Sequence, residues 1–149
     1  MEMLASFERM DDLAFAETRV VTVPPGKAVP AGVYGLLEFY CTDDDCDCRR
    51  VIIKVVSENS ADKVWATISY GWEDAAFYRQ WSPGTQSAAE WLGPTLGPLN
   101  PQSAHAGAFL GLFKHVVLQD ESYVDRLKRH YTMFKNFSKP PKRALAQKS

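Results

Sequence analysis

Apolar and polar residues alternate along three segments in the first half of the chain, at 33–41, 51–56 and 64–70. Successive side chains of a strand point to opposite faces of a sheet, so this alternation predicts three β-strands. A polar turn at 57–62 and a shorter β-rich segment at 19–23 fit the same pattern. The chain therefore predicts an antiparallel β-meander of three to four strands.

The alternation also predicts which way the side chains of the first of these strands point. One face carries mostly apolar residues, namely Val33, Leu37, Phe39 and Cys41. Glu38 falls on the opposite face. We therefore expect Cys41 to project from the apolar side of the sheet and Glu38 from the polar side.

Helical spacing, in which apolar residues recur at steps of three and four, dominates the two ends of the chain. The N-terminal set consists of Met3, Leu4, Phe7, Met10 and Leu13. Further helices are predicted at 74–81, after a capping box at 87–90, at 109–117 and at 123–137. Strands followed by helices favour an α+β fold over alternating β-α-β units. We expect an N-terminal helix and the C-terminal helices to cover the meander.

Length and composition bound the organisation of the chain. Its 149 residues are 46% hydrophobic and 12% aromatic, which is enough for one core and one domain. Pro140-Pro141 should end the last helix, because proline lacks the amide donor that a helix interior needs. We therefore predict a single domain at 1–138 and a basic flexible tail at 139–149.

Charge and hydropathy argue against several classes of protein. The formal net charge is -1, so no overall field favours nucleic acid or a membrane surface. The segment 125–149 is locally basic, with eight Lys or Arg residues and one Asp, which leaves nucleic-acid binding through the C-terminal region as an alternative. Charged residues interrupt the N-terminus, and no stretch approaches the ~20 apolar residues of a bilayer span. We expect a cytoplasmic protein without a membrane segment.

The clearest chemical signal is a cluster of cysteines between two predicted strands. Cys41, Cys46 and Cys48 are the three cysteines of the chain and fall within eight positions. An odd number at such close spacing does not fit a disulfide framework. Three thiolates at one hairpin end suit zinc, which takes four sulfur or nitrogen ligands in tetrahedral geometry. A disulfide or redox role and unliganded thiols are the alternatives.

Zinc bound by three thiolates needs a fourth ligand, from elsewhere in the chain or from water. The chain offers three histidines, His105, His115 and His130. His130 follows Leu127 by three residues and precedes Phe134 by four, which places it beside the buried stripe of the last helix. We expect His130 to complete the site, with His105, His115 or water as alternatives.

Acidic residues surround the cysteines and invite comparison with a calcium-binding loop. The aspartates of 43–47 alternate as in an EF-hand, but the sixth position of such a loop would be Cys48 and the twelfth Lys54, where the motif needs glycine and glutamate. The aspartates are therefore interpreted as turn formers. The adjacent Arg49 and Arg50 would offset part of the local negative charge.

Four short stretches carry a resemblance to a known family. They read EFYC at 38–41, CDCRRV at 46–51, YGW at 70–72 and HY at 130–131. Together they resemble a family of uncharacterised small prokaryotic proteins, over residues 38–131. The resemblance implies no activity, but it implies that His130 works together with the cysteines.

Familiar catalytic signatures are absent from the sequence. It contains no HExxH motif of zinc peptidases, no zinc-deaminase signature and no phosphate-binding loop. The leading hypothesis is a small intracellular zinc-binding protein with a structural Zn2+, acting as a binding or interaction module for an unknown protein or small-molecule partner. The alternative enzyme is a zinc-dependent hydrolase in which water is the fourth ligand and Glu38 or Glu73 is the general base.

Overall fold

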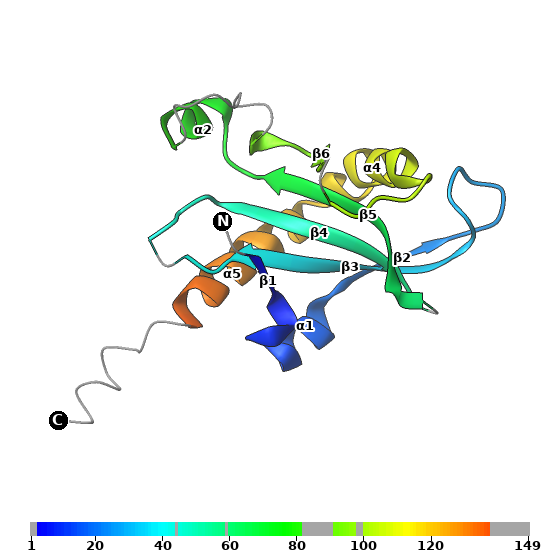
Figure 1. Cartoon of the computed structure of the whole chain (residues 1–149), viewed down its shortest axis with the longest axis horizontal. Helices are drawn as coiled ribbons and strands as arrows, with labels where there is room; N and C mark the ends of the chain where they lie inside the picture. The colour runs from blue at the N-terminus through cyan, green and yellow to red at the C-terminus, as the bar shows by residue number, and fades with distance from the viewer. Residues whose placement is uncertain (1–2, 44, 59, 82–90, 98–99, 138–149) are drawn as a thin grey trace.

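The protein is built on one antiparallel sheet with helices packed against it (Figure 1). The computed structural model describes residues 3–43, 45–58, 60–81, 91–97 and 100–137. The strands in these ranges are β1 (Met3–Ala5), β2 (Arg19–Val23), β3 (Gly32–Cys41), β4 (Arg50–Ser57), β5 (Ser60–Gly71) and β6 (Thr95–Leu96). The helices are η1 (Ser6–Glu8), α1 (Asp11–Glu17), α2 (Ala75–Trp81), α4 (Ala106–His115), η2 (Val117–Gln119) and α5 (Glu121–Phe137).

The order of the strands confirms the predicted meander at the centre of the sheet. The order is β1-β3-β4-β5-β6, and β2 also pairs with β3. Met3 is the partner of Cys41 and Val23 is the partner of Gly32, so β1 and β2 follow one another along the same edge of β3. The described part of the chain thus forms a sheet of six strands rather than three to four, within the α+β class.

The N-terminal helix begins later than the spacing predicted. Met3–Ala5 forms a strand, and α1 begins only at Asp11. The physical reason is that the backbone of Met3–Ala5 pairs with β3, whereas an isolated helix this short gains little from its own hydrogen bonds. The capping box at 87–90 and the predicted tail at 139–149 lie outside the described residues. Trp91 and Leu92, directly after the capping box, are described and are helical, as the sequence predicted.

The face of β3 that meets the helices is the opposite of the predicted one. Tyr34, Leu36, Glu38 and Tyr40 are buried, while Val33, Leu37 and Phe39 are only half-buried. Ring contacts show what covers this face. Tyr34 packs on Phe109 of α4 with centroids 4.8 Å apart, and Tyr40 packs on Phe134 of α5 at 5.4 Å. Only Cys41 is buried as expected from that prediction, because it ends the strand beneath the following loop.

The two large helices divide the sheet between them. Trp65, in the middle of β5, packs on Tyr34 near the start of β3 and on His105 and Phe109 at α4. Tyr40, at the other end of the sheet, packs on Tyr131 of α5. In Figure 1 the hairpin between β3 and β4 accordingly lies at the end of the sheet away from α4. This arrangement places the cysteines of that hairpin beside the C-terminal half of α5. Among the described residues, no helix combines the length and the apolar character that a bilayer span needs.

Candidate metal centre

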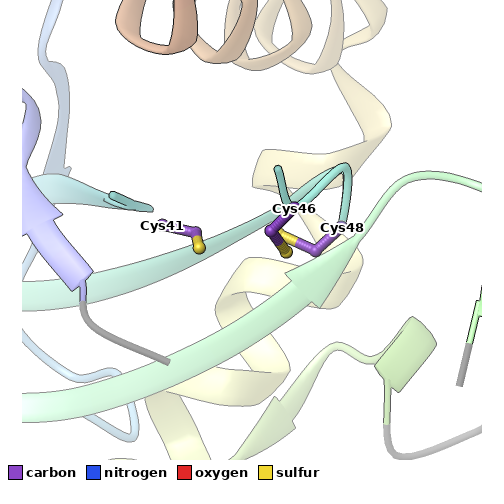
Figure 2. A group of neighbouring side chains, drawn as sticks. All are labelled: Cys41, Cys46 and Cys48. Carbon is purple, nitrogen blue, oxygen red and sulfur yellow. The ribbon is translucent and has the colours of Figure 1, made fainter. Parts of the chain in front are cut away.

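The structure brings the three cysteines together. Their sulfur atoms all lie within 4.8 Å of one another, as expected for ligands that converge on one ion. Cys41 ends β3, while Cys46 and Cys48 come from the loop that leads into β4 (Figure 2). All three are free thiols, Cys41 and Cys48 fully buried and Cys46 half-buried.

Local turn chemistry shapes the loop that carries the sulfurs. The carbonyl oxygen of Asp43 accepts a hydrogen bond from the amide of Cys46 at 3.1 Å, and its side chain accepts one from the amide of Asp45 at 3.0 Å. The chain then turns into β4 at Arg49, whose φ of 49° lies in the left-handed region. The interpretation of the aspartates as turn formers therefore holds for Asp43.

Backbone amides donate to two of the sulfurs. The amide of Asp43 lies 3.4 Å from the Sγ of Cys41, and the amide of Arg50 donates to the sulfur of Cys48. Hydrogen bonds to a charged group favour its charged form. At Cys48 this hydrogen bond offsets only part of the rise in pKa that burial causes.

Without a cation, however, the thiols of Cys46 and Cys48 resist ionisation. Burial, followed by the charges of Cys48 and Cys41, raises the pKa of Cys46 to about 12. Burial also raises the pKa of Cys48. Ligand thiols must lose their protons to bind a metal, and the ion supplies the positive charge that makes this favourable. The cluster is thus stable as neutral thiols or as a metal complex, but not as three bare thiolates.

A buried arginine lies beside the sulfurs. Arg50 is only 7% exposed, and its guanidinium donates to the carbonyl oxygen of Trp91 at 2.9 Å and to the hydroxyl of Ser69. Both partners are neutral, and within the described ranges Arg50 has no carboxylate partner. The groups near it that can become negative are Cys48, Tyr78 and Cys46. A buried charge is costly unless it is paired, so Arg50 favours thiolates at the cluster.

Helix α5 holds the same loop at two points. Lys135 is buried, and its Nζ donates to the carbonyl oxygen of Asp43 at 2.8 Å. The hydroxyl of Tyr131 donates to Oδ1 of Asp47 at 3.1 Å and accepts from the amide of Arg49 at 3.2 Å. The hairpin is thereby attached to the last helix through its loop, on both sides of Cys46.

The structure does not bring His130 to the sulfurs. Its Nδ1 lies 2.7 Å from Glu38 and its Nε2 lies 2.6 Å from Glu17, so carboxylates occupy both ring nitrogens. His130 is buried on the stripe that the spacing predicted, but it meets β3 at Glu38, three residues before Cys41. Tyr131 and Lys135, farther along α5, are the residues that contact the hairpin.

The alternative ligands and the proposed general bases also lie outside the cysteine group. Among the described His, Cys, Asp and Glu residues, only the three cysteines form it. His105 precedes α4 and packs on Trp65, and His115 is exposed at the end of that helix. Glu38 is held by His130 and by the hydroxyl of Tyr40 at 2.6 Å.

Glu73, the other candidate base, is bound elsewhere. Its carboxylate accepts a hydrogen bond from Nη1 of Arg49 at 2.6 Å, and the same guanidinium also contacts Asp47. The Glu73 carboxylate is therefore already paired with the guanidinium of Arg49. Neither carboxylate named for the hydrolase alternative is placed at the cluster.

Most of the basic residues of α5 make contacts within the protein. Arg126 donates to the carbonyl oxygen of Glu17 at 3.0 Å, Arg129 pairs with the Glu17 carboxylate at 2.8 Å, and Lys135 holds Asp43. These contacts explain the basic character of the helix without nucleic acid. Lys128 is exposed, and the basic residues at 139–149 lie outside the described residues.

Sequence reasoning missed two contributors to the site, Tyr131 and Lys135. A signal was present, because a lysine four residues after a tyrosine shares its face of a helix, and this face also carries the buried Phe134. A lysine on the buried side of a helix usually has a polar partner. The partner itself, a carbonyl oxygen 92 residues earlier, depends on the tertiary fold.

Comparison of the chain with protein-family models, with curated proteins and with solved structures finds no match. The resemblance carried by the four short stretches therefore stays a prediction. The function has to be argued from the geometry of the cluster.

Proposed function

We propose that this protein binds one zinc ion through the thiolates of Cys41, Cys46 and Cys48, with water as the fourth ligand. The observation that carries the proposal is the convergence of three sulfurs within 4.8 Å beside the buried guanidinium of Arg50. A zinc ion with three thiolates has a net charge of about -1, and two buried cations, Arg50 and Lys135, are near enough to interact with the sulfurs that would carry it. The complex and Arg50 thus each supply the counter-charge that the other needs.

Zinc is preferred over other ions because of the ligand set and the surroundings. Thiolates select soft or borderline ions, which argues against calcium and magnesium despite the nearby aspartates. Copper(I) also binds thiolates, and elemental analysis distinguishes it from zinc. Free thiols at such close spacing suit a reducing compartment such as the cytoplasm.

We infer a structural role for the ion. The zinc would fix the loop between β3 and β4, and this loop presents the Asp43 carbonyl and the Asp47 carboxylate to α5. Metal binding would thereby stabilise the packing of the last helix on the sheet. The protein would then act as a binding or interaction module whose surface depends on the metal.

Metal content and metal coordination test the proposal. Protein purified without chelator should contain about one zinc per chain, and X-ray absorption should show three sulfur ligands at ~2.3 Å and one oxygen ligand. Cys41→Ser, Cys46→Ser and Cys48→Ser should each lose most of the metal, whereas His115→Ser, at an exposed position, should keep it. Metal-free protein with three titratable thiols would contradict the proposal, and a nitrogen ligand in place of oxygen would restore a histidine to the site.

A further inference from the structure

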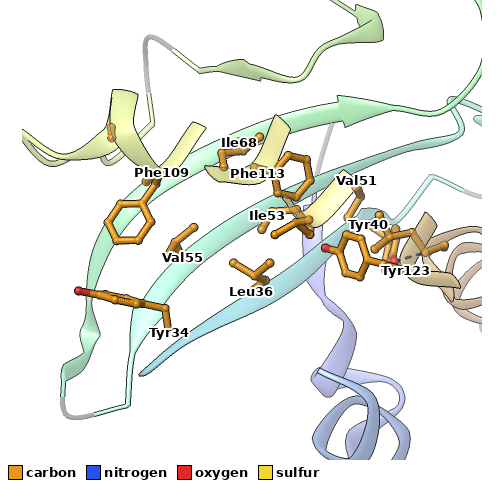
Figure 3. Packing of buried hydrophobic residues seen from close by; sticks show 14 of the residues in the cluster. Tyr34, Leu36, Tyr40, Val51, Ile53, Val55, Ile68, Phe109, Phe113 and Tyr123 are labelled. Atoms are coloured by element: carbon orange, nitrogen blue, oxygen red, sulfur yellow. Dashed lines mark hydrogen bonds between the residues drawn. The ribbon is translucent and has the colours of Figure 1, made fainter. Parts of the chain in front are cut away.

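Helix α4 has more apolar surface than its contact with the sheet uses. One stripe, made of Ala106, Phe109 and Phe113, is buried against the strands, as Figure 3 shows for the two phenylalanines. A second stripe recurs every four residues and consists of Ala108, Leu112 and, directly after the helix, Val116. Val116 is 51% exposed. A helix that is apolar on most sides normally has a second partner.

The second stripe forms one wall of a groove, here called the α4 groove. The opposite wall consists of β2 and the loop that follows it, from Val21 to Val29. The groove has a volume of about 380 Å³. Its lining is aliphatic except for two residues, Thr22 and Lys27. It lies beside α4, at the end of the sheet away from the cysteine hairpin.

The α4 groove adjoins a gap in the core. A small cavity of about 10 Å³ between α4 and the sheet shares Val21 and Leu112 with the groove. The cavity is otherwise lined by core residues such as Ile68 and Phe113. Core packing is normally dense, so this gap marks a place where α4 fits the sheet less closely.

We propose that the α4 groove binds a small amphipathic molecule, with an aliphatic chain in the groove and a carboxylate head paired with the ammonium group of Lys27. The volume lies in the range of roughly 300–1,000 Å³ that is typical of small-molecule sites, and the lining has the usual composition of many apolar and few polar groups. Lys27 is the only ionised group of the lining, and within the described ranges it pairs with no carboxylate. An anionic head therefore complements the one charge of the site. The site is separate from the cysteine cluster and does not depend on the proposed zinc.

Titration of the metal-loaded full chain with decanoate and with decanol tests the proposal. The two probes have the same chain and differ in the charge of the head. Methyl resonances of Val21, Val29 and Leu112 should shift and saturate, with decanoate the tighter ligand. Methyl groups of Val51, which is buried near the cysteine end of the sheet, should stay unchanged.

Two variants test separately how the groove binds the aliphatic chain of the probe and how it binds the carboxylate head. Ala108→Trp should fill the groove and abolish binding, whereas Ala104→Trp, at an exposed position before α4, should not affect it. Lys27→Gln should weaken decanoate by up to about fivefold, the effect of one exposed ion pair, and leave decanol unchanged.

Three outcomes would overturn the proposal. Decanol that binds as tightly as decanoate would remove the role of Lys27. Binding that survives Ala108→Trp would place the ligand elsewhere. No saturable shift with either probe would leave the groove as a surface for a protein partner. Loss of zinc binding would affect none of these measurements, since the two sites share no residue.

Discussion

The Nδ1 of His130 on α5 lies 2.7 Å from Oε1 of Glu38 on β3, and both side chains are almost completely buried. The other ring nitrogen lies 2.6 Å from Glu17, the last residue of α1. An imidazole that faces two carboxylates donates from both nitrogens, and it is then positively charged. His130 therefore joins three elements through charge rather than through metal.

Removing the ring should cost stability but not zinc. We expect His130→Ala to lower the free energy of unfolding by about 3–5 kcal/mol, because it leaves the buried Glu38 without its cation. Zinc content should stay at the level of the parent protein. Chemical denaturation and elemental analysis of the same samples measure both quantities. Loss of the metal in His130→Ala, with His115→Ala unchanged, would show that the histidine is a ligand after all.

The interactions of His130 with Glu38 and Glu17 should also make stability depend on pH. Burial alone lowers the pKa of His130, but hydrogen bonds and charges from Glu38 and Glu17 outweigh it and raise the pKa above the ordinary 6.5. The hydrogen bond from His130, followed by that from Arg129, lowers the pKa of Glu17 below the ordinary 4.5. The histidine's contribution is fully present below pH 6.5 and is lost as the pH rises through its raised pKa. The glutamate's contribution is fully present above pH 4.5 and is lost as the pH falls through its lowered pKa.

Urea unfolding of the parent protein and of His130→Gln tests this dependence. The difference in unfolding free energy should be largest between pH 4.5 and pH 6.5, and it should fall as the pH rises through the raised pKa of His130. Titration of the cysteines affects both proteins and cancels in the difference. A difference that grows toward alkaline pH would contradict the assignment of a charged imidazole.

Two adjacent arginines allow a controlled test of charge at the metal site. Arg50→Met should weaken zinc binding by about 10-fold or more, the usual effect of removing a group that supports the ligands. Arg49→Met should have a smaller effect, because the Arg49 guanidinium pairs with Asp47 and Glu73 instead. Competition with a chelating dye measures both affinities. Equal losses in the two variants would show that overall charge, rather than the buried guanidinium, matters.

The metal-free state of Arg50→Met should behave differently from the zinc-bound state. Without thiolates, the buried guanidinium of Arg50 has no negative partner in the described part of the chain. Replacing it by an apolar side chain of similar length should then leave stability unchanged or raise it. Thermal unfolding of the parent protein and of Arg50→Met, with and without metal, measures whether the effect of the substitution on stability changes sign. A variant that is destabilised equally in both states would assign to Arg50 a packing role only.

Removing the metal should loosen one end of α5 and leave the other end intact. Hydrogen exchange is expected to accelerate at 41–49 and around Tyr131 and Lys135, because the loop that holds these side chains is no longer fixed. Amides near Tyr123 and around Phe113 of α4 should keep their protection. Uniform acceleration over the whole chain would instead indicate global destabilisation.

Local patterns predicted the centre of the sheet and most of the helices. Strands β3, β4 and β5 follow from the alternation of side chains, since each strand carries its own signal. The start of the chain was misassigned because Met3 and Leu4 fit helical spacing equally well, and only pairing with β3 makes them a strand. That pairing joins segments far apart in the sequence, so a local pattern does not predict it.

The site was predictable only as far as it is local. The three cysteines converge because they are close in sequence. The buried face of β3 was predicted the wrong way round because Glu38 reads as a solvent-facing residue, and its cation comes from 92 residues away. The same limit applies to His130, whose place on the buried stripe was clear but whose partner along the strand was not.

The proposed metal ligands span only residues 41–48, and this spacing has a consequence for the order in which the protein is assembled. Closing so short a loop costs little chain entropy, and contacts between near neighbours form early. Arg49 precedes Tyr131 by 82 residues, so during synthesis the cysteines leave the ribosome well before α5 exists. A nascent chain can therefore capture its ion first. The last helix, once made, then docks on a loop whose shape is already set.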